Sequence, residues 1–413
     1  MPSNQHYNMK TTRKFILLII LIFFISIEGI VVFHTGVLPF RKNESLQKLA
    51  DGVISKCNSA NLPTSCYDEE IPNFMVKNLI SMEDAFEVTK LVQQKDPKYL
   101  YCHVLAHKIS FQETSKDLSK WKDVVARCPT TICNNGCQHG ALMRRFNSES
   151  LTEKQISEIL PDLQNVCEPR GKWNPVEVER SMCYHALGHL NMYITNADIN
   201  KSVDICKEIG TKSDGRNYVQ TCTQGVLMTI YQPLEAEDKK LVKDLTPKKE
   251  DVVKFCRQFE GEKFDACHVE AWPLFWPDVL KPEELVKFCN YTKNEASQEK
   301  CYASVMNIIV VELAINQGSI DKLKDYCLGL PKKGRTICFS WGAARMIQID
   351  PRYINEALKI CKAAKEAGVE DNCHKELAKF ARTSFHPDSD NLKQYCSKLP
   401  SPWDTKCLSQ KFQ

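Results

Sequence analysis

Residues 301–328 read CYASVMNIIVVELAINQGSIDKLKDYCL, and this stretch contains the unit that decides the fold. An apolar run begins at Cys301 and continues to Asn316, Gly318 interrupts it, and a helical spacing of apolar residues resumes over Ile320–Leu328. Apolar residues with a helical period on both sides of a glycine predict two helices joined by a short turn. Because a cysteine stands near each end, the unit can be followed along the chain.

Paired cysteines repeat this unit. From Cys167 onward, the first cysteine of each pair usually ends an apolar stretch, and the second begins the next one. First members recur every 33 to 50 residues, and a period of about 35–40 residues is typical of two-helix repeat arrays. We therefore expect each pair to form a disulfide that joins the end of one helix to the start of the next. The expected pairs are Cys57 with Cys66, Cys128 with Cys137, Cys167 with Cys183, Cys206 with Cys222, Cys256 with Cys267, Cys289 with Cys301, Cys327 with Cys338, Cys361 with Cys373, and Cys396 with Cys407.

Two of the 20 cysteines, Cys102 and Cys133, fall outside these nine pairs. We predict that they pair with each other, and the alternative is that one stays free or binds a metal. A further alternative is a zinc site, because Cys128, Cys133, Cys137 and His139 have a C-x4-C-x3-C-x-H spacing. An oxidising compartment favours the disulfides over both alternatives.

The period and the helix pairing resemble those of TPR-like and Sel1-like α-solenoids over roughly residues 57–407. The TPR signature of Trp, Leu-Gly, Tyr, Ala and Pro at fixed offsets is absent. We expect an all-α, disulfide-stapled solenoid, and a low glycine content of 16 in 413 residues agrees with that fold class. The charged stretch 231–252 lengthens one repeat and is expected to be an exposed insertion.

The N-terminal segment predicts on which side of the membrane the repeats lie. Residues 15–27, FILLIILIFFISI, are uncharged and apolar, and the run resumes after Glu28. Basic residues precede it, which is typical of a transmembrane signal anchor with a cytoplasmic N-terminus. A cleaved signal peptide is the alternative. The predicted organisation is a cytoplasmic tail over 1–14, a transmembrane anchor over 15–33, a linker over 34–56 and an extracytoplasmic repeat domain over 57–413, with histidine-bearing repeats at about 100–230 and plain repeats at about 250–407.

The charge balance excludes one class of partner. Lys and Arg number 55 against 51 Asp and Glu, so the net charge is 55 − 51 = +4. Binding to nucleic acid needs a concentrated basic face, which this even distribution does not provide. We therefore expect no nucleic-acid partner. The predicted partners are the membrane, through the N-terminal helix, and a protein or peptide on the concave face of the solenoid.

Histidines recur at matching places in successive repeats. The segments CHVLAHKIS, CQHGALMRR, CYHALGHLNM and CTQGVLMTI begin at residues 102, 137, 183 and 222. Residues four apart lie on one helix face, so two imidazoles with this spacing can share a metal ion. A His/Met set suits copper, and imidazole alone suits zinc or haem iron. The first position is His103, His139, His185 and Gln224, and the second is His107, Met143, His189 and Met228.

The alternative interpretation is that these positions are packing contacts. Gly140, Ala186 and Gly225 would permit close helix approach, and the histidines would cap neighbouring carbonyls. The pattern stops after Met228, which favours a ligand role, because a packing need should persist along the array.

Two further groups of residues stand out in the following repeat. His268 and Glu270 are expected to be ordinary surface residues of a helix, and the alternative is that they extend a polar groove. Trp272, Phe275 and Trp276 are either a core contact at a helix end or a partner anchor.

Two functions remain. The first is a membrane-anchored extracytoplasmic scaffold that binds a protein or peptide, and the alternative is a metal- or haem-binding protein with a histidine-lined site. The zinc peptidase motif HExxH needs a glutamate directly after its first histidine. Val104 follows His103 and Ala186 follows His185, so the motif is absent. The sequence contains no identified nucleophile–base pair and therefore predicts no reaction type.

Overall fold

The computed structural model describes residues 44–77, 79–96, 99, 102–129, 132–146, 150–233, 236–349, 351–369 and 372–409. Within these residues the fold is all-α and contains no strand. The predicted transmembrane anchor over 15–33 and the first part of the linker lie outside them. None of the described helices combines the length and the apolar character that a membrane crossing requires.

The N-terminal half contains the helices that carry the clustered histidines, α4 (His103–Lys116), α6 (Gly136–Phe146) and α8 (Glu177–Ile194). Side-chain caps define several helix starts in this half, such as Ser81 with Asp84 and Thr152 with Gln155, which form capping boxes. The half contains a helix over 44–57, α2 (Pro63–Val76), α3 (Met82–Lys95), α4 (His103–Lys116), α5 (Trp121–Arg127), α6 (Gly136–Phe146), α7 (Glu153–Asn165), α8 (Glu177–Ile194), α9 (Ile199–Gly210) and α10 (Val219–Tyr231).

The C-terminal half is built from helices of 5 to 18 residues. Its helices are α11 (Ala236–Val242), α12 (Val252–Cys256), α13 (Glu262–Glu270), α14 (Pro282–Cys289), α15 (Glu295–Val310), α16 (Ile320–Leu328), α17 (Lys332–Ile349), α18 (Ile354–Glu366), α19 (Asn372–Ser384), α20 (Asp390–Cys396) and α21 (Trp403–Leu408).

The two-helix unit predicted from residues 301–328 is confirmed. The helix α15 continues as a π-helical segment over Val311–Asn316. Gly318 then adopts a φ of 62°, a left-handed conformation that glycine takes without steric cost. The Ser319 side chain caps the start of α16, so the second helix begins where the periodicity resumes.

The ten disulfides have the predicted pairing, and none of the cysteines is free. Nine of them link cysteines that are 9 to 16 residues apart, as the repeat spacing predicts, and the tenth closes a separation of 31 residues. The bonds join Cys57 with Cys66, Cys102 with Cys133, Cys128 with Cys137, Cys167 with Cys183, Cys206 with Cys222, Cys256 with Cys267, Cys289 with Cys301, Cys327 with Cys338, Cys361 with Cys373, and Cys396 with Cys407.

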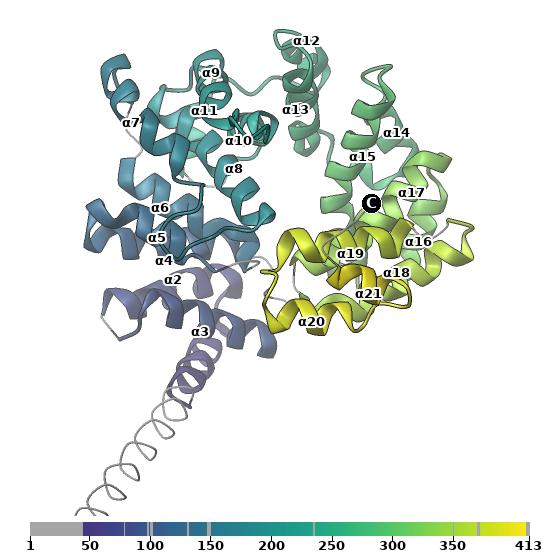
Figure 1. The fold of residues 1–413 in the computed structure, drawn as a ribbon, viewed down its shortest axis with the longest axis horizontal. Coiled ribbons are helices and arrows are strands. Elements are labelled where there is room, and N and C mark those ends of the chain that lie inside the picture. Colours follow the sequence, from purple (N-terminus) through teal and green to yellow (C-terminus); the bar gives the residue numbers. More distant parts are fainter. Residues whose placement is uncertain are drawn as a thin grey trace, which may run out of the picture.

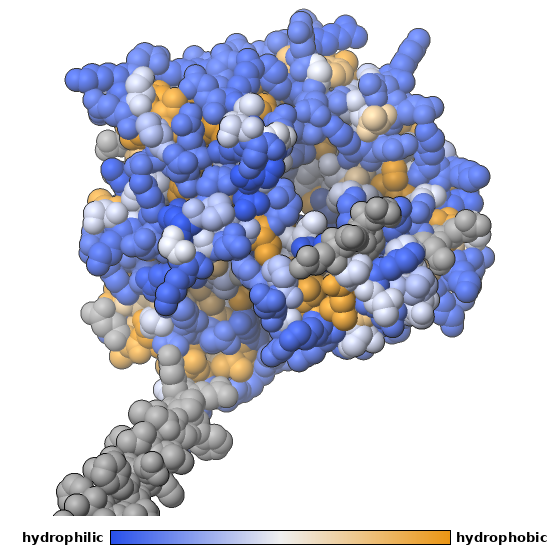
Figure 2. All heavy atoms as spheres, viewed as in Figure 1, coloured by the Kyte–Doolittle hydropathy of each residue, from blue (hydrophilic) through white to orange (hydrophobic). Residues whose placement is uncertain are grey.

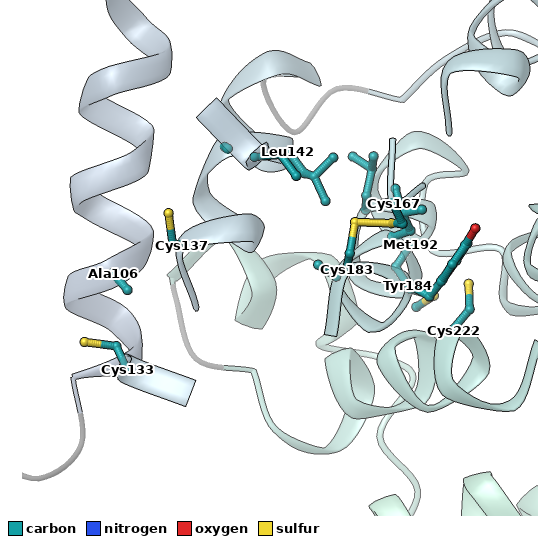
Figure 3. Packing of buried hydrophobic residues seen from close by; sticks show 14 of the residues in the cluster. Ala106, Cys133, Cys137, Leu142, Cys167, Cys183, Tyr184, Met192 and Cys222 are labelled. Atoms are coloured by element: carbon teal, nitrogen blue, oxygen red, sulfur yellow. A yellow bond between two sulfur atoms is a disulfide. The ribbon is translucent and has the colours of Figure 1, made fainter. Parts of the chain in front are cut away.

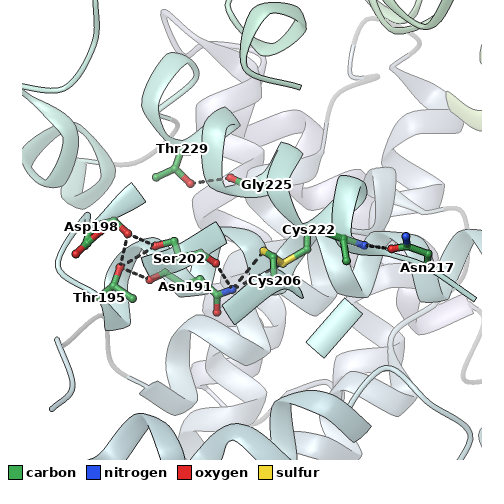
Figure 4. Close-up of a disulfide and its surroundings, with 10 residues drawn as sticks. Asn191, Thr195, Asp198, Ser202, Cys206, Asn217, Cys222, Gly225 and Thr229 are labelled. Atoms are coloured by element: carbon green, nitrogen blue, oxygen red, sulfur yellow. Dashed lines mark hydrogen bonds between the residues drawn. A yellow bond between two sulfur atoms is a disulfide. The ribbon is translucent and has the colours of Figure 1, made fainter. Parts of the chain in front are cut away.

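Three of these bonds bear on the candidate sites. Cys206 near the end of α9 bonds to Cys222 in α10, and the amide of Asn191 in α8 lies 3.5 and 3.7 Å from the two sulfur atoms (Figure 4). The disulfides also occupy all three cysteines of the alternative zinc site, which excludes that site. These cysteines are Cys128, Cys133 and Cys137.

The buried residues form two hydrophobic clusters. One extends from Leu46 to Ala271, and the other from Val269 to Cys407. Figure 3 shows part of the first cluster, where the Cys167–Cys183 disulfide lies beside Met192 and Tyr184. The face of the molecule in Figure 2 is mostly hydrophilic, with its hydrophobic residues in small groups.

The succession of helix pairs bends round until its two ends meet (Figure 1). α19 contacts α8, and His386 Nε2 lies 3.2 Å from Glu179 Oε1. A cavity of about 390 Å³ is lined by residues of both ends, including Gln93 of α3 and Tyr395 of α20. The all-α, disulfide-linked fold is confirmed, whereas a TPR- or Sel1-like solenoid is not, because these contacts join helices that an open array keeps apart.

Candidate metal centre

Close helix crossings bring the predicted histidines together. A Cβ atom on Gly140 of α6 would lie 2.1 Å from the carbonyl oxygen of His107 in α4. A Cβ atom on Gly225 of α10 would lie 2.0 Å from the carbonyl oxygen of His185 in α8. Only glycine allows such an approach. The predicted packing role of these two glycines is therefore consistent with the structure, and it is this packing that makes side chains of paired helices face each other.

The first helix pair, α4 and α6, assembles three imidazoles. Ligand nitrogens of His103, His107 and His139 all lie within 4.8 Å of one another. The ring centroids are 4.6 to 5.0 Å apart. Nδ1 of His103 lies 3.2 Å from the carbonyl oxygen of Cys133. A carbonyl only accepts, so this bond places the proton on Nδ1 and leaves the lone pair of the neutral ring on Nε2.

The second helix pair, α8 and α10, assembles two imidazoles and a thioether. His185 Nε2 lies 3.3 Å from Met228 Sδ and 3.2 Å from His189 Nε2. His189 Nδ1 lies 2.9 Å from Thr229 Oγ1. Two nitrogens and a sulfur therefore converge within one small region, and the sulfur comes from the position that corresponds to Met143 and not to His139.

The two groups form one continuous cluster. The His139 ring centroid lies 5.0 Å from that of His189 and 5.9 Å from that of His185. Burial and the neighbouring imidazoles hold the pKa of His139 and of His189 well below the ordinary histidine value. Burial lowers the pKa of His185 to about 4. At neutral pH these rings are uncharged, which is the form that binds metal ions.

A cavity of about 870 Å³ opens onto the cluster. His107, His139 and His189 line it, together with Met143. Apolar side chains of α4 also line the cavity, together with two carboxylates of α2 and two of α11. These lining residues are Val104, Phe111, Asp68, Glu69, Glu237 and Asp238.

Sequence reasoning did not find the acidic side of this cavity. Glu237 and Asp238 belong to α11, which lies in the stretch expected to be an exposed insertion. The insertion is mostly exposed, as expected, but the Tyr193 hydroxyl of α8 donates a hydrogen bond to Asp238 and holds α11 at the cavity. No local pattern signals this contact, because the two residues are 45 positions apart.

The predicted ligand Met143 and the predicted polar-site residue Gln224 lie beside the cluster. Met143 lies one turn beyond His139 and forms part of the cavity wall. Gln224 is half-buried on α10, next to the glycine at which α8 crosses. Gln224 occupies the position in its helix pair that His139 occupies in the first pair.

The expectation that His268 is a surface residue is wrong. Its side chain is 2% exposed, because α13 packs between α10 and α15. Its Nε2 lies 2.8 Å from the carbonyl oxygen of Phe288, and its ring stacks on Tyr291. Glu270 is half-buried and accepts a hydrogen bond from Gln232, and burial raises its pKa to about 8.

The aromatic residues after α13 divide between core and surface. Phe275 packs against Phe288 with ring centroids 4.7 Å apart. Trp272 and Trp276 contact each other edge to face, and Trp276 is 36% exposed. The group is therefore a core contact at a helix end with one exposed tryptophan.

The fold and the site together define a class: an all-α, disulfide-linked protein with a histidine-lined cavity. No family model, curated protein or solved structure matches the chain. The geometry of the site therefore carries the functional conclusion.

Proposed function

We propose that this chain is a metal-binding protein that holds a transition-metal cation on His103, His107 and His139. The observation that carries the proposal is the convergence of three ligand nitrogens within 4.8 Å. Tetrahedral bonds of about 2.0–2.1 Å would place such nitrogens about 3.3 Å apart. Binding would therefore require these nitrogens to approach one another by up to about 1.5 Å.

The surroundings of the three imidazoles support a cation with an open coordination position. Three protein ligands with a free fourth position are typical of catalytic metal sites, whereas structural sites are closed. His107 and His139 line the 870 Å³ cavity, so the free position faces space that a small ligand can enter. Imidazole ligands suit zinc and copper. Four carboxylates and one ammonium group, that of Lys108, also line the cavity, and this excess of negative charge favours a positively charged occupant.

The test is the metal content of the full chain, purified from an oxidising compartment without a chelator or a histidine tag. We expect about one equivalent of zinc or copper at this centre, and we expect His139→Ala to lose it. His374→Ala is the matched control, because His374 lies on α19 and not on the cavity wall. A folded wild-type chain that binds neither metal would overturn the proposal.

A membrane-anchored extracytoplasmic scaffold is the second candidate. In this proposal residues 15–33 anchor the chain, and the helix pairs act as TPR- or Sel1-like repeats that bind a protein or peptide. The exposed Trp276 and Trp341 favour it, because tryptophan is enriched at the centres of interfaces. Binding of the full chain to a peptide array should weaken in Trp276→Ala and Trp341→Ala. Protease protection of the full chain in vesicles tests the anchor.

A further inference from the structure

We propose that α8 and α10 carry a second centre, formed by His185, His189 and Met228, that binds copper in its +1 state. This second centre rests on the proposed metal-binding function and adds a second cation of different chemistry. The contacts that support it are independent of the first centre, because they involve different residues on different helices.

The donor atoms of this second centre are already in contact range. Nε2 of His185 lies 3.3 Å from the Met228 sulfur and 3.2 Å from Nε2 of His189. A thioether is a soft ligand that selects Cu(I) and that harder divalent cations such as zinc rarely use. Two imidazoles and a thioether therefore provide a set that favours copper.

Hydrogen bonds outside the centre orient the His189 lone pair inward. The Thr229 hydroxyl donates to the carbonyl oxygen of Gly225 at 3.0 Å, so its oxygen accepts from Nδ1 of His189 at 2.9 Å. Nδ1 therefore carries the proton, and Nε2 carries the lone pair. A hydroxyl that fixes the tautomer in this way acts as an outer-shell partner of a metal ligand.

The ring of His185 also faces inward. Its Nε2 lies 3.3 Å from Met228 Sδ and 3.2 Å from His189 Nε2, so one nitrogen of this ring contacts both other donors of the centre. A cation at this point would replace the contact between the two Nε2 atoms.

The second centre repeats the geometry of the first with one change of donor. In both pairs a helix with two histidines four residues apart crosses a partner helix at a glycine, Gly140 or Gly225. The partner helix supplies His139 in the first pair. In the second pair Gln224 stands at that position, and Met228 one turn further along approaches His185 instead. The second helix pair thus has the same histidine spacing and the same glycine crossing as the first, with a sulfur donor in place of the third nitrogen.

The two proposed centres are adjacent and open onto the same cavity. The rings of His139 and His189 are 5.0 Å apart, and both line the same space. We therefore expect a pair of adjacent sites with three nitrogen donors in one and two nitrogens and a sulfur in the other.

The experiment is an anaerobic titration of the metal-free full chain with Cu(I) against a chromophoric chelator, and separately with Zn(II). Ag(I) serves as a redox-inert probe for the sulfur-containing centre. We expect two Cu(I) per chain, one Zn(II) per chain, and sulfur scattering in the copper X-ray absorption spectrum. Met228→Leu should lower the Cu(I) stoichiometry to one, remove the sulfur scattering and weaken Ag(I) binding by at least tenfold, with Zn(II) binding unchanged.

The controls separate this proposal from that for the first centre. Met346→Leu, which alters a buried methionine of the C-terminal cluster, should bind both ions as the wild type does. His139→Ala should lose Zn(II) and keep the sulfur-containing Cu(I) site.

If Met228→Leu keeps two Cu(I) and its sulfur signal, the second centre is overturned. If the wild type binds Cu(I) through sulfur but never binds Zn(II), the second centre stands and the assignment of the first to zinc fails. If His189→Gln folds and binds Cu(I) with unchanged stoichiometry and affinity, the second centre is likewise overturned.

Discussion

At the scale of single residues, two glycines decide whether the histidines can meet. Gly140 and Gly225 stand where a neighbouring backbone carbonyl leaves no room for a Cβ atom. A backbone atom cannot move aside as the end of a flexible side chain can. These positions therefore couple helix packing to the geometry of both proposed metal centres.

Substitution of Gly140 tests this coupling. We expect Gly140→Ala to lower the free energy of unfolding by about 2–3 kcal/mol, because an added atom in a packed interface forces the helices apart. Metal binding at the first centre should weaken with it. Gly52→Ala is the matched control, because a Cβ there meets nothing within 4 Å, and we expect it to stabilise the helix over 44–57 by up to about 1 kcal/mol. Denaturant unfolding under non-reducing conditions measures both, and equal effects would contradict the role of the crossing.

Glu270 provides a pH-dependent test of burial. Its pKa is raised from 4.5 to about 8 in the folded chain. Between these values the unfolded chain loses the proton and the folded chain keeps it, so this group lowers stability as the pH rises from about 4.5 to about 8. We expect Glu270→Gln to reduce that loss by roughly 1–3 kcal/mol. The measurement is the free energy of unfolding at pH 5 and pH 8.

Glu260→Gln is the control for this pH dependence, because Glu260 is exposed. Its stability difference between pH 5 and pH 8 should match that of the wild type. A Glu270→Gln variant with the wild-type difference would show that the carboxyl is ionised in the folded chain at neutral pH.

At the scale of secondary-structure elements, nine of the ten disulfides join consecutive helices and fix their relative position, and the tenth joins Cys102 at the start of α4 to Cys133 just before α6. The Cys206–Cys222 bond joins α9 to α10, and the amide of Asn191 lies against both sulfur atoms. α10 carries Met228 and the glycine of the second crossing. This bond therefore holds the helix that carries two features of the proposed second centre.

Removal of this disulfide should have a local effect on the site. We expect the double substitution Cys206→Ala and Cys222→Ala to lower the free energy of unfolding by about 3 kcal/mol, which is the chain-entropy value for a loop of about 15 residues. Hydrogen exchange should accelerate in α9 and α10, and Cu(I) binding should weaken.

The Cys396–Cys407 bond provides the comparison. It joins α20 to α21 at the far end of the chain sequence, with a separation of 11 residues. Its double alanine variant should accelerate exchange in α20 and α21 and leave metal binding unchanged. Equal effects of the two double variants on Cu(I) binding would contradict the local role of Cys206–Cys222.

At the scale of the whole molecule, the two hydrophobic clusters differ in that only the first contains the proposed metal ligands. All five clustered histidines belong to helices of the first cluster, and the second cluster begins at Val269. A cation that binds only the folded state stabilises it by RT ln(1 + [L]/Kd), which is about 2.7 kcal/mol at 100 times Kd. That stabilisation acts directly on the part of the chain that holds the ligands.

Calorimetry with and without zinc tests this division. We expect metal to raise the unfolding temperature of the transition that includes α4, α6, α8 and α10, by several degrees. The transition of the second cluster should shift less, and His139→Ala should abolish the difference. An equal shift of all transitions would show that the contacts of α19 with α8 make the two clusters one cooperative unit.

The sequence by itself determined the all-α class, the ten disulfides and the positions of the clustered histidines. These features follow local patterns in the chain: a cysteine pair recurs where one two-helix unit meets the next, and residues four apart share a helix face whatever the helix packs against. They could be read without knowledge of the fold. The unit at 301–328 is an example, because its glycine and its serine cap act within a few residues.

Only the tertiary structure decided how the helix pairs are stacked. It brought α6 beside α8 so that His139 meets His189, placed α11 at the cavity, buried His268 and joined α19 to α8. The physical reason is that the turn at each helix junction depends on side-chain packing between neighbouring pairs, and small rotations accumulate over the array. Local periodicity fixes which face a histidine occupies, and the accumulated rotation fixes what that face meets.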